Sequence, residues 1–90
     1  MEKIIITVVG KDTTGIIARV CSYLAESKIN ILDISQTIVQ GYFNMMMIAD
    51  MEACSKDFLT IANDLESVGS ELGVQVNCQK EAIFEKMHRI

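Results

Sequence analysis

A short run of β-branched residues near the start of the chain constrains the fold more than any other feature. Residues 3–9, with the sequence KIIITVV, place isoleucine or valine at both odd and even positions. Because successive side chains of a strand point to opposite faces, this segment predicts a strand that is apolar on both faces. Such a strand belongs in the middle of a sheet, and both of its faces need a cover.

The hydrophobic period then changes along the chain. Apolar residues recur at helical spacing after Gly15, which predicts a first helix over residues 14–27. Residues 29–39 alternate, and the tight-turn pair Gln40-Gly41 leads into another alternating segment over residues 42–51. These two segments predict a β-hairpin.

A second helix is expected after the hairpin. Ser55 is suited to be its N-cap, Asp57 to lie in its first turn, and Gly73 to follow its last residue. The apolar positions between them fall at helical steps: Phe58, Ala62, Leu65, Gly69 and Leu72. Residues 74–78 alternate again and predict a last strand, and residues 80–90 are expected to form a short helical tail.

The predicted order of elements is β-α-β-β-α-β. This order predicts an α+β fold of the ferredoxin-like type, in which a four-stranded antiparallel sheet carries two helices on one face and a short C-terminal helix follows. We expect one domain over residues 1–79 and a helical tail over residues 80–90. Since two helices cover only one face, the other face is expected to pack against the tail or a second subunit. A homodimer is favoured.

The charge balance limits the classes of partner. With 8 basic and 12 acidic residues among 90, the net charge is −4, which argues against nucleic acid because phosphate binding relies on lysine and arginine. The longest unbroken apolar run is only residues 45–49, too short to span a membrane. Since the N-terminus opens directly into a strand and not a signal peptide, we expect a cytoplasmic protein.

The sequence does not favour catalysis or a metal site. The three cysteines, Cys21, Cys54 and Cys78, are far apart, and His88 is the one histidine, so neither a zinc site nor a disulfide framework is expected. The cysteines are interpreted as small buried hydrophobes. No nucleophile and base occur at a connected spacing, and no phosphate-binding glycine signature is present, so we expect neither an enzyme nor a cofactor.

Two motifs resemble those of a known family. Residues 8–17, VVGKDTTGII, run from the first strand through a polar loop into the first helix, and residues 28–31, KINI, open the second strand. With the order of elements, they resemble the ACT domain family over residues 1 to about 79. The whole chain is similar to small stand-alone ACT proteins, akin to the ACT repeats of the glycine-cleavage regulator. The resemblance implies regulatory binding of an amino acid or related metabolite at an interface between paired domains, without catalysis.

The loop before the first helix is also suited to a carboxylate on physical grounds. Backbone N–H groups at a helix start lack intrahelical acceptors and lie at the positive end of the helix dipole. Asp12 is suited to accept from a ligand ammonium, Gly15 allows close approach, and Asn30, from the same or the facing subunit, can bridge to either end of a zwitterion. The candidate ligand-binding residues are Asp12, Thr13, Thr14, Gly15, Ile16, Ile17 and Asn30.

Each of these residues has an alternative structural interpretation. Asp12 or Thr13 would cap the first helix, Gly15 would permit tight packing of that helix on the sheet, and Asn30 would satisfy backbone groups. The alternative function is a protein–protein interaction module without a ligand of its own, in which the apolar sheet face only pairs with a partner.

Overall fold

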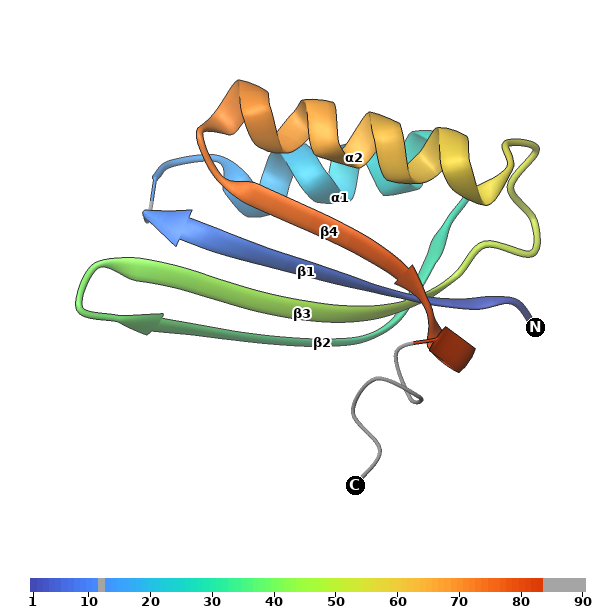
Figure 1. Cartoon of the computed structure of the whole chain (residues 1–90), viewed down its shortest axis with the longest axis horizontal. Coiled ribbons are helices and arrows are strands. Elements are labelled where there is room, and N and C mark those ends of the chain that lie inside the picture. Colours follow the sequence, from blue (N-terminus) through green and yellow to red (C-terminus); the bar gives the residue numbers. More distant parts are fainter. Residues whose placement is uncertain (12, 84–90) are drawn as a thin grey trace.

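The strand that is apolar on both faces, β1 (Lys3–Lys11), lies inside a four-stranded sheet. The computed structural model describes residues 1–11 and 13–83. The strand order is β2-β3-β1-β4, and all neighbouring strands are antiparallel (Figure 1). The remaining elements are α1 (Ile16–Glu26), β2 (Asn30–Val39), β3 (Tyr42–Asp50), α2 (Phe58–Leu72) and β4 (Gln75–Lys80).

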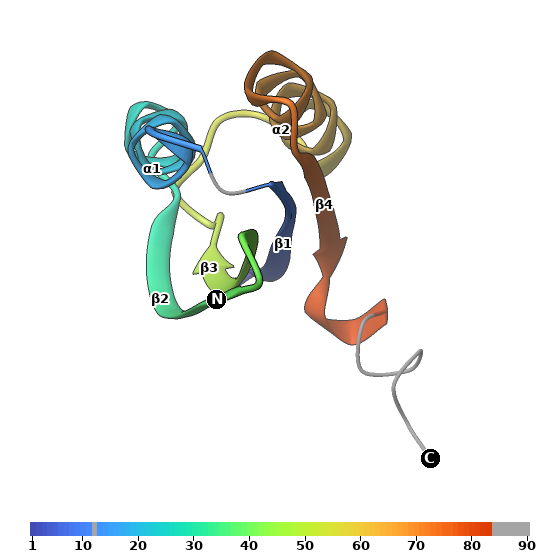
Figure 2. The ribbon, with the colours of Figure 1, turned by 90° about the vertical axis from the view of Figure 1, so that its left-hand side faces the viewer.

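The predicted ferredoxin-like fold is confirmed. Both helices lie on one side of the sheet, α1 toward β2 and α2 toward β4 (Figure 2). Residues 81–83 form a helical turn after β4, at the start of the predicted tail. The rest of the predicted tail, residues 84–90 with His88, and the candidate residue Asp12 lie outside the described residues.

The hairpin and the end of the second helix are confirmed in detail. Gln40 and Gly41 both have positive φ, 54° and 80°, as the favoured two-residue hairpin turn requires. Gly73 ends α2 with φ 74°, a conformation that favours glycine. The predicted N-cap Ser55 is wrong: Asp57 caps α2, because its carboxylate accepts a hydrogen bond of 2.9 Å from the Thr60 N–H.

The predicted end of the first strand and the predicted start of the first helix also differ from those in the structure. β1 extends to Lys11, beyond the predicted range of residues 3–9, because Gly10 and Lys11 pair with Phe43 and Tyr42 of β3. α1 begins at Ile16, since Gly15 has the left-handed φ of 91° and ends the non-helical loop. At Gly10 a Cβ atom would lie 2.7 Å from Val74 Cγ1, so this position excludes any side chain.

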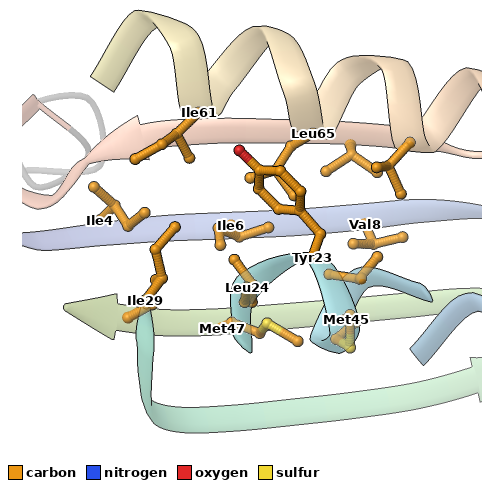
Figure 3. Packing of buried hydrophobic residues seen from close by; sticks show 14 of the residues in the cluster. Ile4, Ile6, Val8, Tyr23, Leu24, Ile29, Met45, Met47, Ile61 and Leu65 are labelled. Atoms are coloured by element: carbon orange, nitrogen blue, oxygen red, sulfur yellow. The ribbon is translucent and has the colours of Figure 1, made fainter. Parts of the chain in front are cut away.

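The core lies between the helices and one face of the sheet. Ile4, Ile6 and Val8 of β1 are completely buried there, beside Met45 and Met47 of β3. From the helices, the core receives Val20, together with Tyr23, Leu24, Ile61 and Leu65 (Figure 3). The two-faced strands are confirmed, because the alternate residues of β1 and β3 point away from the helices.

The face of the sheet opposite the helices, here called the open face, is partly apolar. It carries the odd-numbered residues of β1, the even-numbered residues of β3 and the facing residues of β2 and β4. Val9, Tyr42 and Met46 are 46%, 53% and 42% exposed on it, whereas Ile5 is buried. No helix among residues 1–11 and 13–83 is long and apolar enough to cross a membrane.

A polar cluster joins the two helices above the core. The Tyr23 hydroxyl of α1 donates a hydrogen bond of 2.6 Å to the Asp64 carboxylate of α2. Lys56 Nζ lies 3.2 Å from the same carboxylate oxygen and 5.0 Å from the centre of the Tyr23 ring. The hydroxyl and then the ammonium lower the pKa of Asp64, whereas burial and the carboxylate raise the pKa of Tyr23.

Charge substitutions at two adjacent methionines should separate the two faces. We expect Met47→Glu to unfold the protein, because an unpaired buried carboxylate costs several kcal/mol, comparable to the roughly 5–15 kcal/mol of a whole domain. Met46→Glu places its charge on the exposed face, so it should remain folded. Circular dichroism during urea titration measures both effects. A folded Met47→Glu variant would contradict the assignment of faces.

The polar cluster should make stability depend on pH. Because the folded pKa of Asp64 is lowered, its contribution is present above the unfolded pKa of about 4 and is lost as the pH falls through the folded value. We expect Asp64→Asn and Tyr23→Phe to lose less stability than the wild type between pH 5 and pH 2, about the range in which carboxylates titrate. Glu66→Gln, an exposed change on the same helix, is the control, and a wild-type-like acid profile in both cluster variants would contradict this role.

Candidate functional site

The loop before α1 ends at Gly15, which acts as the N-cap without any side-chain hydrogen bond. The Gly15 carbonyl accepts the first intrahelical bond, 2.9 Å from the Arg19 N–H. The alternative in which Thr13 caps the helix is therefore wrong. The N–H groups of the first turn of α1 have no intrahelical acceptors, and that turn contains no acidic residue.

Gly15 does not serve close packing. A Cβ atom built on it would meet no atom of the described residues within 4 Å, so the packing interpretation is wrong. Glycine is favoured here because φ is 91°, a conformation that costs other residues roughly 1–2 kcal/mol. The space beside it is open to an approaching group.

The remaining loop residues fall into two groups. Thr13 and Thr14 are exposed, so their hydroxyl groups are accessible. Ile16 is 2% exposed and Ile17 is 37% exposed. Ile16 therefore anchors the helix start in the core, and only its backbone is suited to face a ligand.

Asn30 lies at the opposite end of the sheet from this loop. It is the first residue of β2 and stands beside Asp50 of β3, which itself stands beside Lys3 of β1. The loop instead follows Lys11, eight residues further along β1, a distance of roughly 26 Å at 3.3 Å per residue. The structure brings Thr13 to Ile17 together but does not bring Asn30 to them within one chain (Figure 1).

The long edge of the sheet is apolar on the helix side. β2 is an edge strand, and Ile34 and Ile38 stand beside the buried Met47 and Phe43 of β3, yet they are 43% and 59% exposed. Beside them, the side of α1 turned away from α2 carries mostly small residues. This β2 edge surface consists of Ile17, Cys21, Ala25, Ile34 and Ile38.

The short edge of the sheet differs in chemistry. β4 has six residues, and its exposed side chains Gln75, Asn77 and Lys80 are polar or charged. Short length and lysine protect an edge strand from pairing, whereas a long apolar edge invites it. The β2 edge is therefore the one suited to pair with another strand.

Two of the hollows among the described residues lie away from this loop. One of about 580 Å³ lies between α2 and β4 and is lined by Glu66, Ser70 and Asn77 among others. The other, of about 330 Å³, lies on the open face between Thr7, Ser35 and Met46. Neither hollow contains a predicted ligand-binding residue.

Metal chemistry finds no support in the part of the chain that the structure describes. Among those residues, no group of three His, Cys, Asp or Glu side chains could hold a metal ion. The three cysteines are free and partly buried, and burial raises the pKa of Cys78 to about 11. They pack against the core as expected for small hydrophobes.

The β2 edge surface and the polar cluster of Tyr23, Lys56 and Asp64 were not predicted from the sequence. The alternation of β2 already placed Ile34 and Ile38 on one face, but it could not show that this strand lies at the edge. The partners of the polar cluster lie 41 and 8 residues apart, and no sequence spacing connects such a set.

Comparison with known proteins agrees with this architecture. The profile of the ACT domain family matches residues 2–79. A UPF0237 protein of Bifidobacterium longum is 60% identical over the full length of both chains. The structure of an ACT domain protein from Streptococcus pneumoniae superposes with a TM-score of 0.82 at 46% identity, covering 93% of this chain and 94% of that one.

A more distant structure shares the fold alone. A protein described as a glycine cleavage system transcriptional repressor has a TM-score of 0.75 at 20% identity, covering 88% of this chain and 45% of that one. The resemblance based on residues 8–17 and 28–31 is therefore confirmed. From its matched profile, its full-length relative and its fold, the chain belongs to the ACT domain family.

Proposed function

We propose that the protein is a regulatory module that binds an amino acid or related metabolite at the interface of a homodimer. ACT domains are regulatory ligand-binding modules. The observation that carries the proposal is the separation of the two halves of the candidate site. Asn30 lies at one end of the sheet, and the loop that contains Gly15 follows the other end. A second chain is therefore needed to bring them together.

Pairing through the β2 edge would supply that second chain. In an antiparallel pair, a two-fold axis near the middle of β2 carries Asn30 of one chain to the end of the other sheet where β1 leads into the loop. The same pairing would satisfy the outer backbone groups of β2 and cover Ile34 and Ile38. The small residues Cys21 and Ala25 would let the two α1 helices approach closely.

The chemistry of the combined site suits a zwitterion. The free N–H groups at the start of α1 favour a carboxylate, and the space beside Gly15 admits it. Asp12 is proposed to accept from the ammonium group, with Thr13 and Thr14 at its side. Asn30 of the second chain offers both a donor and an acceptor.

We also propose that the protein is not catalytic and acts in the cytoplasm. Regulation would act through the subunit interface that the ligand spans, with no reaction at the site. The three free cysteines are suited to a reducing compartment. The second candidate, an interaction module without a ligand, is favoured by the exposed Val9, Tyr42 and Met46 of the open face.

A thermal-shift screen against the common amino acids tests the ligand. At a hundred times its dissociation constant, a ligand stabilises by about 2.7 kcal/mol, and each kcal/mol moves the melting temperature of a domain this small by roughly 4–8 °C. We expect Asp12→Ala and Asn30→Ala to abolish the shift, whereas Asn63→Ala, an exposed change on α2, should retain it. If no amino acid shifts the wild type, the interaction module becomes the better account.

Mixing the two variants tests whether the site is shared between chains. In a two-fold pair of one Asp12→Ala chain and one Asn30→Ala chain, one site has both wild-type residues, so an equal mixture should recover about one quarter of the sites. Isothermal titration of the mixture measures this fraction. A mixture without any binding, beside a wild type that binds, would contradict a site shared between chains.

A further inference from the structure

Two lysines differ from the other basic side chains of the described residues, because neither has a partner there. Lys11 and Lys28 are exposed, and their side chains form no ion pair, hydrogen bond or ring contact with residues 1–11 and 13–83. The other four described basic side chains each have one: Lys3 with Glu81, Arg19 with Glu71, Lys56 with Asp64, and Lys80 with the ring of Phe58. In a chain of net charge −4, two ammonium groups therefore stay available to an anion from outside.

Lys28 also occupies a backbone position that favours glycine. Its φ is 60°, and its N–H donates to the carbonyl oxygen of Ala25 at 3.1 Å. The next N–H, of Ile29, donates to the carbonyl oxygen of Leu24 at 2.9 Å. α2 ends with the same pair of hydrogen bonds, but its left-handed residue is Gly73, the usual residue of this motif. A lysine kept in a conformation that is unfavourable for it points to a role for its charged group.

The two lysines accompany the two halves of the proposed site. Lys11 is the last residue of β1, and the loop of residues 12–15 follows it directly. Lys28 lies two residues before Asn30, in the connection between α1 and β2. Within one chain these two positions lie at opposite ends of the sheet, so each half of the site has one lysine.

The edge pairing of the proposed function would bring both lysines to one site. A two-fold axis near the middle of β2 sets Asn30 of the second chain beside Val39. Val39 stands beside Tyr42, and Tyr42 stands beside Lys11. The same rotation sets the two α1 helices antiparallel on one side of the joined sheet, so the C-terminal end of one α1 lies toward the N-terminal end of the other. Lys28 of the second chain then lies at the loop end of the first, as Lys11 does.

The carboxylates at this end leave the lysines with an excess of positive charge. Asp50, which stands beside Asn30, already accepts from the N–H groups of Glu2 and Glu52 at 3.0 Å each. Glu26, the last residue of α1, is exposed and lies near Lys28 in sequence. With Asp12 assigned to the ammonium group of the ligand, Glu26 balances only one of the two lysines.

We propose that the ligand of the shared site is an amino acid with an anionic side chain, either a carboxylate or a phosphate ester, held by Lys11 of one chain and Lys28 of the other. The proposal rests on the proposed function and names the ligand class of the same site. The α-carboxylate would bind the N–H groups at the start of α1, and the ammonium group would bind Asp12. The second anionic group would accept hydrogen bonds from the two lysines, whose ammonium groups have three donors each.

Isothermal titration of the full chain with matched ligands tests this class. The charged ligands are L-aspartate, L-glutamate and O-phospho-L-serine, and their neutral counterparts are L-asparagine, L-glutamine and L-serine. We expect the tightest charged ligand to bind about tenfold or more tightly than its counterpart, because hydrogen bonds between charged groups are roughly twice as strong as neutral ones. The preference should decrease as salt is added, since salt screens exposed charges. Succinate, which lacks the ammonium group, should bind more weakly than L-aspartate.

Variants of the two lysines test their role. Lys28→Gly removes the ammonium group and suits the left-handed backbone, so we expect a folded protein in which the preference for the anionic side chain falls about tenfold. Lys28→Arg keeps the charge and should keep the preference, whereas Lys11→Gln should lose it as Lys28→Gly does. Lys80→Gln, on the opposite edge strand β4, is the control and should bind like the wild type. The affinity for the neutral ligands should not change in any of these variants.

An equal mixture of Lys11→Gln and Lys28→Gly chains tests whether the lysines come from different chains. In a mixed pair one site has both lysines, so about one quarter of all sites should regain the wild-type affinity. A mixture in which no site recovers would overturn the assignment of the lysines to different chains.

The remaining outcomes separate this proposal from the proposed function. Neutral amino acids that bind as tightly as charged ones would overturn the anionic class and leave the shared site intact. A less stable Lys28→Gly variant with an unchanged ligand preference would assign Lys28 to the dipole of α1 alone and overturn its role in binding. The absence of binding by any amino acid would overturn both proposals.

Discussion

The burial of β1 in the middle of the sheet is the constraint on which the rest of the structure depends. Its backbone pairs with β3 on one side and β4 on the other, so its N–H and C=O groups form hydrogen bonds with both neighbouring strands. Its side chains Ile4, Ile6 and Val8 point toward the helices and form the centre of the core against which both helices pack. Because the helices take one face only, the composition of β1 also determines that the opposite face is partly apolar.

The two edges of the sheet follow from this centre but have different properties. β4 is short and polar and lies under α2 (Figure 2), whereas β2 is long and leaves Ile34 and Ile38 exposed on the helix side. A domain of 90 residues buries a modest share of its surface, so an uncovered apolar edge is a feature that a partner can use. The asymmetry gives the fold one preferred direction of association.

Local sequence signals predicted the elements because each signal acts over a few residues. The β-branched run of β1, the turn at Gln40-Gly41 and the glycine after α2 specify backbone conformations that nearby residues alone determine. The N-cap of α2 is Asp57 and not the predicted Ser55. The prediction failed because serine and aspartate are both good caps. Only the three-dimensional course of the chain before α2 decides between them.

The candidate site was predictable in its chemistry but not in its arrangement. The residues of the loop are adjacent in sequence, so their common location follows from the chain. Asn30 was associated with them through the family resemblance, and neither its distance nor its need for a second chain can be read from spacing. The exposure of Ile38 likewise depends on strand order, which is a property of the whole sheet.

Val74 packs closely against the end of β1 and against α2, and so limits how far the end of β1 can move. A side chain at Gly10 would collide with Val74 Cγ1, and one at Gly69 would lie 2.8 Å from the Val74 carbonyl oxygen, so the end of β1, α2 and the start of β4 meet at one crowded point. The chain cannot move freely before Lys11, and Ile16 is fixed again in the core. The end of β1 and the start of α1 are therefore both held by packing, so the core fixes where the candidate loop begins and where it ends.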